Sequence, residues 1–184
     1  MRTLTGLVQE FADRFDEKKR RRNMIDFSDM EQFALAILTR NTEGKIVPSA
    51  VAEEYQERFA EVMVDEYQDS NLVQETILTS VSGMSKGRNN MFMVGDVKQS
   101  IYRFRLSRPE LFMEKYDTYS VESSPCQRID LHKNFRSRKE VLDSTNYLFE
   151  KLMFREFGGI EYDENAALYA GAEFPPIPED AVFT

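Results

Sequence analysis

The chain has very little cysteine and histidine, two residue types that cross-link proteins or carry much of their chemistry. Its 184 residues include one cysteine, Cys126, and one histidine, His132. A single cysteine cannot form a disulfide within the chain, and such sparse use is typical of a reducing compartment. A single histidine argues against a histidine-based metal site and against a Ser-His catalytic triad. We therefore expect a cytoplasmic protein in which Cys126 is a buried structural thiol.

Long apolar stretches are also absent. No run approaches the ~20 apolar residues that span a bilayer, and residues 1–4 do not open a signal peptide. Hydrophobic residues make up 41% of the chain and charged residues 30%, as in ordinary globular domains. The formal net charge of −8 argues against a surface that binds nucleic acid over its whole extent. We expect no membrane partner.

Two short apolar runs each stop abruptly at carboxylates. Residues 62–69 read Val-Met-Val-Asp-Glu-Tyr-Gln-Asp, and residues 91–96 read Met-Phe-Met-Val-Gly-Asp. Such runs are typical of strands buried in a parallel sheet, and ligands of open α/β sheets bind beyond the carboxyl ends of the strands. We therefore expect Asp65, Glu66 and Asp96 to lie together at one sheet edge, where carboxylates could hold Mg²⁺ and activate a water. The alternative is a pair of strands that merely end in solvent.

Helical periodicity and turn signals surround these runs. We expect helices over residues 4–22, from a capping box at residues 28–31, and from residues 48–49, with a turn at residues 41–45. A further helix is expected over residues 71–81, between the two runs. Strand, crossover helix and strand then form a βαβ unit, which should be right-handed.

The second half of the chain has two more helix starts. Capping boxes at residues 107–110 and 137–140 each precede an apolar stripe at helical spacing. Residues 121–125 are polar and end in a proline, as an inter-domain linker would, and residues 128–131 have the pattern of a strand. We therefore expect a new folding unit to follow the linker.

Charge is unevenly distributed along the chain. Residues 97–109 contain four basic residues and no acid, whereas residues 161–184 contain six acids and neither lysine nor arginine. A basic segment beside carboxylates in an acidic protein indicates local recognition of phosphate. Residues 18–22 form a second basic run. It could contact a nucleic-acid backbone, but we favour a solvated helix C-terminus stabilised by the macrodipole.

The segment at residues 95–105 reads Gly-Asp-Val-Lys-Gln-Ser-Ile-Tyr-Arg-Phe-Arg. The amide of Gln99 could orient a water or contact a terminal phosphate, and the arginines could neutralise charge on a transferring phosphoryl group. Tyr102 and Phe104 alternate with arginine, a pattern on which single-stranded nucleic acid stacks at roughly 1–3 kcal/mol per base. The alternative is that this aromatic pair faces the core.

Four segments, in order, resemble motifs of the UvrD/Rep-like superfamily 1 DNA helicases. Residues 64–69 resemble helicase motif II, residues 94–105 resemble motif III, and residues 131–137 (Leu-His-Lys-Asn-Phe-Arg-Ser) resemble motif IV. Residues 26–30 are similar to the segment through which these proteins re-enter the first motor domain after an insertion.

Within the superfamily, residues 105–112 and 158–164 are most similar to the AddA (RexA) family of helicase–nuclease subunits. The resemblance implies an α/β fold, a partial RecA-like (P-loop NTPase) parallel sheet flanked by helices. Residues 1–120 would hold the end of a helical insertion and the back half of the first motor domain. Residues 121–184 would hold the start of the second motor domain and an acidic tail.

The resemblance also implies a role for each matching residue of the nucleotide site. Asp65 would hold Mg²⁺, and Glu66 would be the general base that activates water for ATP hydrolysis. Gln99 would sense the terminal phosphate, and Arg136 would reach the γ-phosphate as an arginine finger. Arg105 would help link the nucleotide site to the cleft between the motor domains.

The remaining implications concern DNA. Tyr102 and Phe104 would stack on DNA bases, although several relatives carry tryptophan where Phe104 stands. The motor would move 3′ to 5′, act on double-stranded ends in repair and recombination, carry its exonuclease elsewhere, and bind a second protein of the AddB (RexB) type.

One helicase motif is missing. The sequence contains no Gly-x-x-x-x-Gly-Lys-Ser/Thr loop, whose backbone amides and lysine cradle the β- and γ-phosphates. We therefore expect the sheet to lack the P-loop strand, the chain to be an internal piece of a longer protein, and the piece alone to be inactive.

Two other functions remain open. A metal-dependent phosphodiesterase would use Asp65, Glu66, Asp69 and Asp96, but this leaves Gln99 without a role. A non-enzymatic module would bind other proteins through the acidic tail, which suits the missing loop but does not explain why the motif residues occur together.

Overall fold

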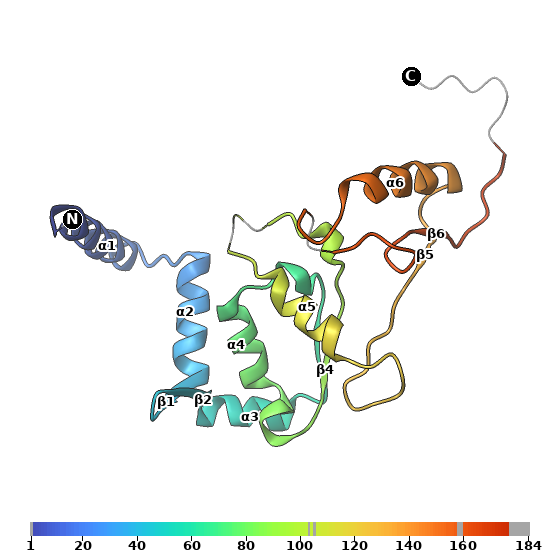
Figure 1. Ribbon diagram of the computed structural model, residues 1–184. Helices are drawn as coiled ribbons and strands as arrows, with labels where there is room; N and C mark the ends of the chain where they lie inside the picture. The colour runs from blue at the N-terminus through green and yellow to red at the C-terminus, as the bar shows by residue number, and fades with distance from the viewer. Residues whose placement is uncertain (1, 103, 105, 158–159, 177–184) are drawn as a thin grey trace. The chain divides into compact units, whose positions relative to one another are not determined.

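The computed structural model describes residues 2–102, 104, 106–157 and 160–176. The chain divides into two compact units. The first unit comprises Met1–Asp65 and Ser70–Val94, and the second comprises Glu66–Asp69 and Gly95–Thr184. Each unit combines helices with short strands, and each includes a small parallel sheet (Figure 1). The predicted α/β class is therefore confirmed at this level.

The described part of the first unit has a helix in each range that periodicity predicts. These helices are α1 (Arg2–Arg21), α2 (Phe27–Leu38), α3 (Ala50–Arg58) and α4 (Leu72–Val81). Helix α4 packs against both α2 and α3 (Figure 1). The unit is thus organised around α4, the helix that connects its two parallel strands.

The start of α2 differs from the prediction. Asp26 and Asp29 form the capping box: the Asp26 carboxylate accepts the Asp29 amide at 2.8 Å, and the Asp29 carboxylate accepts the Asp26 amide at 2.9 Å. The predicted box at residues 28–31 is therefore wrong. The Asp26 carboxylate accepts one of the free amides at the helix start, so the helix begins at Phe27.

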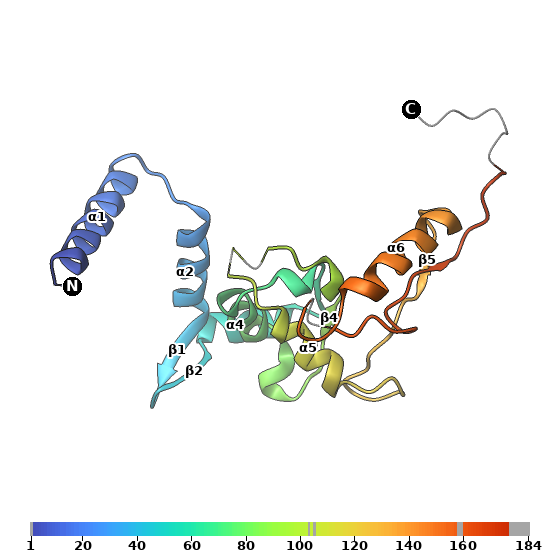
Figure 2. The same cartoon turned by 45° about the horizontal axis from the view of Figure 1, so that its top comes forward.

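A β-hairpin follows α2. Strands β1 (Thr39–Thr42) and β2 (Lys45–Pro48) pair antiparallel with Thr42 opposite Lys45 (Figure 2). The two loop residues, Glu43 and Gly44, both have positive φ, +53° and +83°, as a type I′ turn requires. The turn was predicted, but the strands were not, because their mostly polar residues show no alternating pattern.

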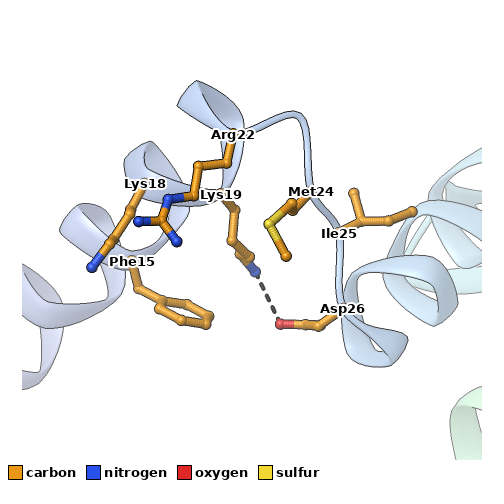
Figure 3. A pocket seen from close by; sticks show the side chains of 7 residues that line it. All are labelled: Phe15, Lys18, Lys19, Arg22, Met24, Ile25 and Asp26. Atoms are coloured by element: carbon orange, nitrogen blue, oxygen red, sulfur yellow. Dashed lines mark hydrogen bonds and ion pairs between the residues drawn. The ribbon is translucent and has the colours of Figure 1, made fainter.

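The basic end of α1 is held by carboxylates beside a small pocket (Figure 3). Lys19 Nζ lies 2.6 Å from an Asp29 oxygen, 3.2 Å from Asp26 and 3.3 Å from Asp16. The hydrogen bond that Lys19 donates to Asp29 is the main reason that the pKa of Lys19 is raised. The pocket has a volume of about 340 Å³ and is lined by Phe15, Lys18, Lys19, Arg22, Met24, Ile25 and Asp26. Lys19 therefore anchors the turn between α1 and α2.

The predicted βαβ unit is present. Strands β3 (Val62–Val64) and β4 (Met91–Met93) pair parallel, with Met63 opposite Phe92. The Val94 amide extends this ladder to the Val64 carbonyl at 2.8 Å. The expectation that both strands are fully buried is wrong, because Met63 is 68% exposed and Phe92 is 54% exposed. The described residues cover one face of this sheet and leave the other open.

A buried asparagine ties the loop before β4 to the chain before β3. This loop includes the 3-10 helix η2 (Gly83–Lys86). The side-chain oxygen of Asn90 accepts the Gly83 amide at 2.7 Å, and its nitrogen lies 3.3 Å from the carbonyl oxygens of Phe59 and Ala60. Because Asn90 is buried, each of these bonds is made away from water. Together they set the start of β4 beside the start of β3.

The second unit consists of short elements around two helices. Its described elements are the 3-10 helices η1 (Tyr67–Asp69) and η3 (Val97–Gln99), the helices α5 (Pro109–Thr118) and α6 (Lys139–Leu152), and the strands β5 (Lys133–Asn134) and β6 (Tyr169–Ala170). Strands β5 and β6 pair parallel. Cys126 is only half-buried, so the expectation of a buried thiol is wrong.

Both helix starts in this unit lack the predicted capping boxes. The N-cap residue of α5 is Arg108, which makes no side-chain cap bond, and Pro109 follows it at a position that needs no amide partner. The N-cap of α6 is Arg138, again without a side-chain bond. Asn134 instead accepts the Ser137 amide at 2.8 Å. The helices were predicted correctly, but neighbouring residues, not serines, shape their starts.

Residues 128–131 do not form the predicted strand. Arg128 instead donates to the Tyr116 carbonyl at 2.6 Å and pairs with Asp130 at 3.0 Å. Its guanidinium also lies 4.0 Å from the centroid of the Tyr116 ring. Side-chain contacts therefore hold this segment, and the backbone ladder begins only at β5.

Within the described part of the chain, every helix falls short of the length or the apolar character that a bilayer crossing requires.

We expect Asn90→Ala to lower the free energy of unfolding of the 184-residue chain by about 1–3 kcal/mol, because the buried Gly83 amide loses its acceptor. Urea unfolding followed by circular dichroism measures this change. The neighbouring exposed Asn89 provides the matched control, Asn89→Ala, which should leave the midpoint nearly unchanged. Equal midpoints for both variants would show that the Asn90 bonds do not stabilise the fold.

Candidate functional site

The candidate site is built from the two segments that follow β3 and β4. Asp65 comes directly after β3, and Gly95 and Asp96 come shortly after β4. Because the two strands are parallel and in register, their carboxyl ends lie at the same sheet edge. From Glu66 and Gly95 onward, the two segments belong to the second unit, whose contacts define the geometry described below.

A hydrogen-bonded chain of side chains connects these two segments. Gln68 Nε2 donates to Glu66 Oε2 at 2.7 Å, and Gln68 Oε1 accepts the Asp96 amide at 3.0 Å. Asp96 Oδ2 in turn accepts Gln99 Nε2 at 3.1 Å. The chain therefore brings Glu66, Asp96 and Gln99 together, as the strand pattern predicted.

Gln68 lies at the centre of this arrangement. Its side chain is completely buried, and both ends of its amide have partners. A Cβ atom at Gly95 would lie 2.6 Å from Gln68 Oε1 and 3.0 Å from the Phe112 ring. Glycine is therefore required at position 95, because any side chain there would displace the buried amide or the aromatic ring.

The backbone at Glu66 is held in an uncommon conformation. Its φ is +51°, in the left-handed region that residues with a side chain rarely adopt. The Asp69 amide donates to the Glu66 carbonyl at 3.0 Å and closes the turn. Such strain persists where surrounding contacts impose it, and it often occurs at functional sites. Here the next residues, Tyr67 and Gln68, are both buried and hold the turn in place.

The carboxylate of Asp96 is occupied by groups of its own segment. Asp96 caps η3 by accepting the Lys98 amide at 3.1 Å, and it pairs with Lys98 Nζ at 2.9 Å. Its other oxygen accepts Gln99. Asp96 is therefore suited to shaping the segment that carries Gln99 and poorly suited to binding a metal.

Asp69 is the acid with a shifted titration. Burial, and then the nearby negative charge of Glu66, raise the pKa of Asp69. One of its carboxylate oxygens, Oδ1, is buried and has no hydrogen-bond partner among the described residues. Asp69 and Glu66 therefore interact electrostatically on one short turn.

The described residues contain no group of three or more His, Cys, Asp or Glu that could hold a metal ion. Asp65 and Glu66 are both exposed. Mg²⁺ is commonly held by one or two carboxylates together with substrate phosphates and water. The donor set therefore fits a magnesium–nucleotide complex and does not fit an all-protein metal cage.

The other predicted residues lie apart from the hydrogen-bonded chain or outside the described part. Arg136 has an exposed side chain, and its described hydrogen bond runs from its backbone amide to Asn134 at 2.9 Å. Arg105 lies outside the described residues. The rings of Tyr102 and Phe104 have centroids 6.0 Å apart and planes inclined by 49°. Phe104 is 77% exposed, so the core-facing alternative does not hold for it.

Sequence reasoning missed the part played by Gln68. In the sequence this residue is only one letter of the helicase motif, although a glutamine two positions after a glutamate is a usable signal. An amide between carboxylates can donate to one partner and accept from another. What the sequence could not indicate is that this amide would be buried and would reach the segment after β4.

The sequence also matches known proteins. The family model for the UvrD/REP helicase N-terminal domain matches residues 2–120. The chain is similar to proteins whose names describe large ATP-dependent helicase/nuclease subunits: it is 57% identical over 98% of its length to the one from Lachnoclostridium phytofermentans and 53% identical over 95% to the one from Acetivibrio thermocellus. It spans only 13–14% of these relatives. The chain belongs to the UvrD/REP helicase N-terminal domain family.

Proposed function

We propose that this chain is the part of an ATP-dependent DNA helicase/nuclease that holds the hydrolytic carboxylates and the phosphate-sensing amide of a RecA-like motor domain. The observation that carries the proposal is the continuous hydrogen-bonded connection from Glu66 through Gln68 and Asp96 to Gln99. Membership of the family and the names of the relatives support DNA-coupled ATP hydrolysis as the reaction.

In this proposal Glu66 is the general base. Its carboxylate is exposed, so water can reach it, and Gln68 holds one of its oxygens at 2.7 Å. The carboxylate accepts a proton from the water whose oxygen attacks the terminal phosphorus of ATP. As that bond forms, the bond from phosphorus to the leaving oxygen of ADP breaks. Glu66 therefore needs a fixed orientation toward the water.

Asp65 would hold Mg²⁺ beside the nucleotide. The residue directly follows β3 and is exposed, which leaves room for the ion and its water ligands. When bound, Mg²⁺ would neutralise charge on the β- and γ-phosphates. The second carboxylate of the pair, Glu66, then remains available to accept a proton.

Gln99 would contact the terminal phosphate. Its side chain is exposed, and its Nε2 is held by Asp96 at 3.1 Å, so its amide is oriented by the same segment that Gln68 binds. We further propose that Arg136 reaches the γ-phosphate from the second motor domain and that Arg105 helps link the nucleotide site to the cleft.

DNA and a second protein would be the partners of the longer chain. Tyr102 and Phe104 form a partly exposed ring pair, which supports stacking on the bases of a single strand. We propose 3′-to-5′ movement in the cytoplasm, action on double-stranded ends, and a partner protein of the AddB type. The division into residues 1–120 of the first motor domain and 121–184 of the second remains part of the proposal.

The rival phosphodiesterase is less well supported. It needs several carboxylates free to bind metal, yet the Asp96 carboxylate is occupied by Lys98 and Gln99. The described residues also lack a group of three metal-binding side chains. The rival interaction module depends on the acidic tail, whose residues 177–184 lie outside the described part.

We expect the purified 184-residue chain to show no DNA-stimulated ATP hydrolysis. It has no phosphate-binding loop, so the β- and γ-phosphates lack the backbone cradle and lysine that hold them during transfer. Release of inorganic phosphate with and without single-stranded DNA measures this. Hydrolysis by the chain that disappears in Glu66→Gln would contradict the expectation.

In the full-length protein, we expect Glu66→Gln to slow ATP hydrolysis by about 10²–10⁴, the usual contribution of a general base. ATP binding should change little, because the amide keeps the size of the carboxylate. Steady-state hydrolysis and equilibrium binding of a fluorescent ATP analogue separate the two effects. Glu54→Gln, at an exposed position of α3, is the control and should retain the normal rate. A normal rate in Glu66→Gln would remove this residue from its proposed role.

A further inference from the structure

The buried amide of Gln68 makes contacts that its place in the motif does not explain. Among the described contacts, one end of the amide binds the side chain of Glu66 and the other binds the backbone of Asp96. Because the side chain is completely buried, losing either bond would leave a polar group without water to replace the partner. The amide therefore fixes two segments relative to each other at the candidate site.

Only an amide of this length fits both contacts. A carboxylate offers acceptors without a donor, and an alkyl chain offers neither. The absence of a side chain at Gly95 makes room for Oε1, because a Cβ there would lie 2.6 Å away. The rings of Tyr67 and Phe112, with centroids 6.4 Å apart, pack in the same small unit. The surroundings thus hold the Gln68 side chain in one place.

Glu66 depends on such a support. Its side chain is exposed, and its backbone has a φ of +51°. An exposed glutamate has three rotatable side-chain bonds, so it samples many orientations unless a partner restricts it. The hydrogen bond from Gln68 Nε2 comes from a donor that is buried and held at both ends. This bond selects the orientation in which Glu66 points toward the segment after β4.

We propose that Gln68 is a positioning residue for the reaction, which orients the Glu66 carboxylate and couples it to the segment that carries Gln99. The inference rests on the proposed role of Glu66 as the general base. Gln68 itself touches neither ATP nor the attacking water. It acts through the two groups that do, because a misplacement of about 1 Å can cost about 10²-fold in rate.

The isosteric substitution Gln68→Glu tests this role. When protonated, the introduced carboxyl group can donate to Glu66 and still accept the Asp96 amide. When ionised, it places a second negative charge against Glu66, and two carboxylates in contact share one proton and titrate at a raised apparent pKa. The other described charged groups near this pair are Asp69, Asp96, Lys98 and Lys115, and the variants and the parent all retain them.

The expected result in the full-length protein is a loss of kcat that grows with pH. Relative to the parent, kcat of Gln68→Glu should fall by about 10²-fold at about pH 8.5 and recover much of this loss at about pH 6. The KM for ATP should change little, because Gln68 does not contact the nucleotide. Gln68→Met fills similar space without either bond, and its loss of kcat should be the same at all pH values.

Gln74 offers a matched control. Its amide is used in the same way, since Oε1 accepts the Asn71 amide at 3.1 Å and Nε2 donates to Glu31 at 2.8 Å. Gln74→Glu therefore creates the same carboxylate pair between α4 and α2, away from Glu66. We expect it to lower thermal stability while the ratio of its kcat to that of the parent stays constant with pH.

The outcomes separate the two proposals. If Glu66→Gln slows hydrolysis but Gln68→Glu and Gln68→Met both match the parent, Gln68 is not a positioning residue and the proposed function stands. If Glu66→Gln hydrolyses ATP at the normal rate, the proposed function itself fails. A pH-independent loss in Gln68→Glu, equal to that in Gln74→Glu, would mean that the amide only stabilises the fold. A loss that follows pH in Gln68→Glu alone supports the proposal.

Discussion

The need to satisfy one buried amide constrains this site more than any other interaction. Gln68 has no contact with solvent, so its donor and its acceptor must both be met by protein groups, and leaving either unmet costs about 1–3 kcal/mol. The partners are the Glu66 carboxylate and the Asp96 backbone. Two segments that are far apart in sequence are therefore held together by desolvation and hydrogen bonding. No attraction between the acids themselves is needed, since like charges repel.

The parallel pair β3 and β4 provides the frame for this contact. Each strand has only three residues, and a sheet this small cannot be stable without further packing. Helix α4 and the Asn90 bonds set the register, and the register decides which residues leave the sheet at the same edge. The open face that carries Met63 and Phe92 shows that the described residues cover one side of the sheet.

Local sequence signals located the helices better than they located the helix ends. The stripe of α2 was clear, but its capping box formed from Asp26 and Asp29 and not from the serine and glutamate nearby. Serine, threonine and aspartate are all good caps, so the choice depends on where the chain enters the helix. Lys19 influences that choice at α2, because it pairs with both aspartates. The same reasoning applies to residues 128–131, where Arg128 binds Tyr116 and Asp130 in place of a neighbouring strand.

By itself, the sequence determined the order of the elements, the α/β class, the family motifs and the meeting of Glu66, Asp96 and Gln99 at one sheet edge. These features depend on residue type and on spacing along the chain, both of which can be read directly. Only the tertiary structure decided that Gln68 is buried between them, that Gly95 must lack a side chain, and that one face of β3 and β4 stays open. Burial depends on which distant segments pack together, and a linear pattern does not contain that information.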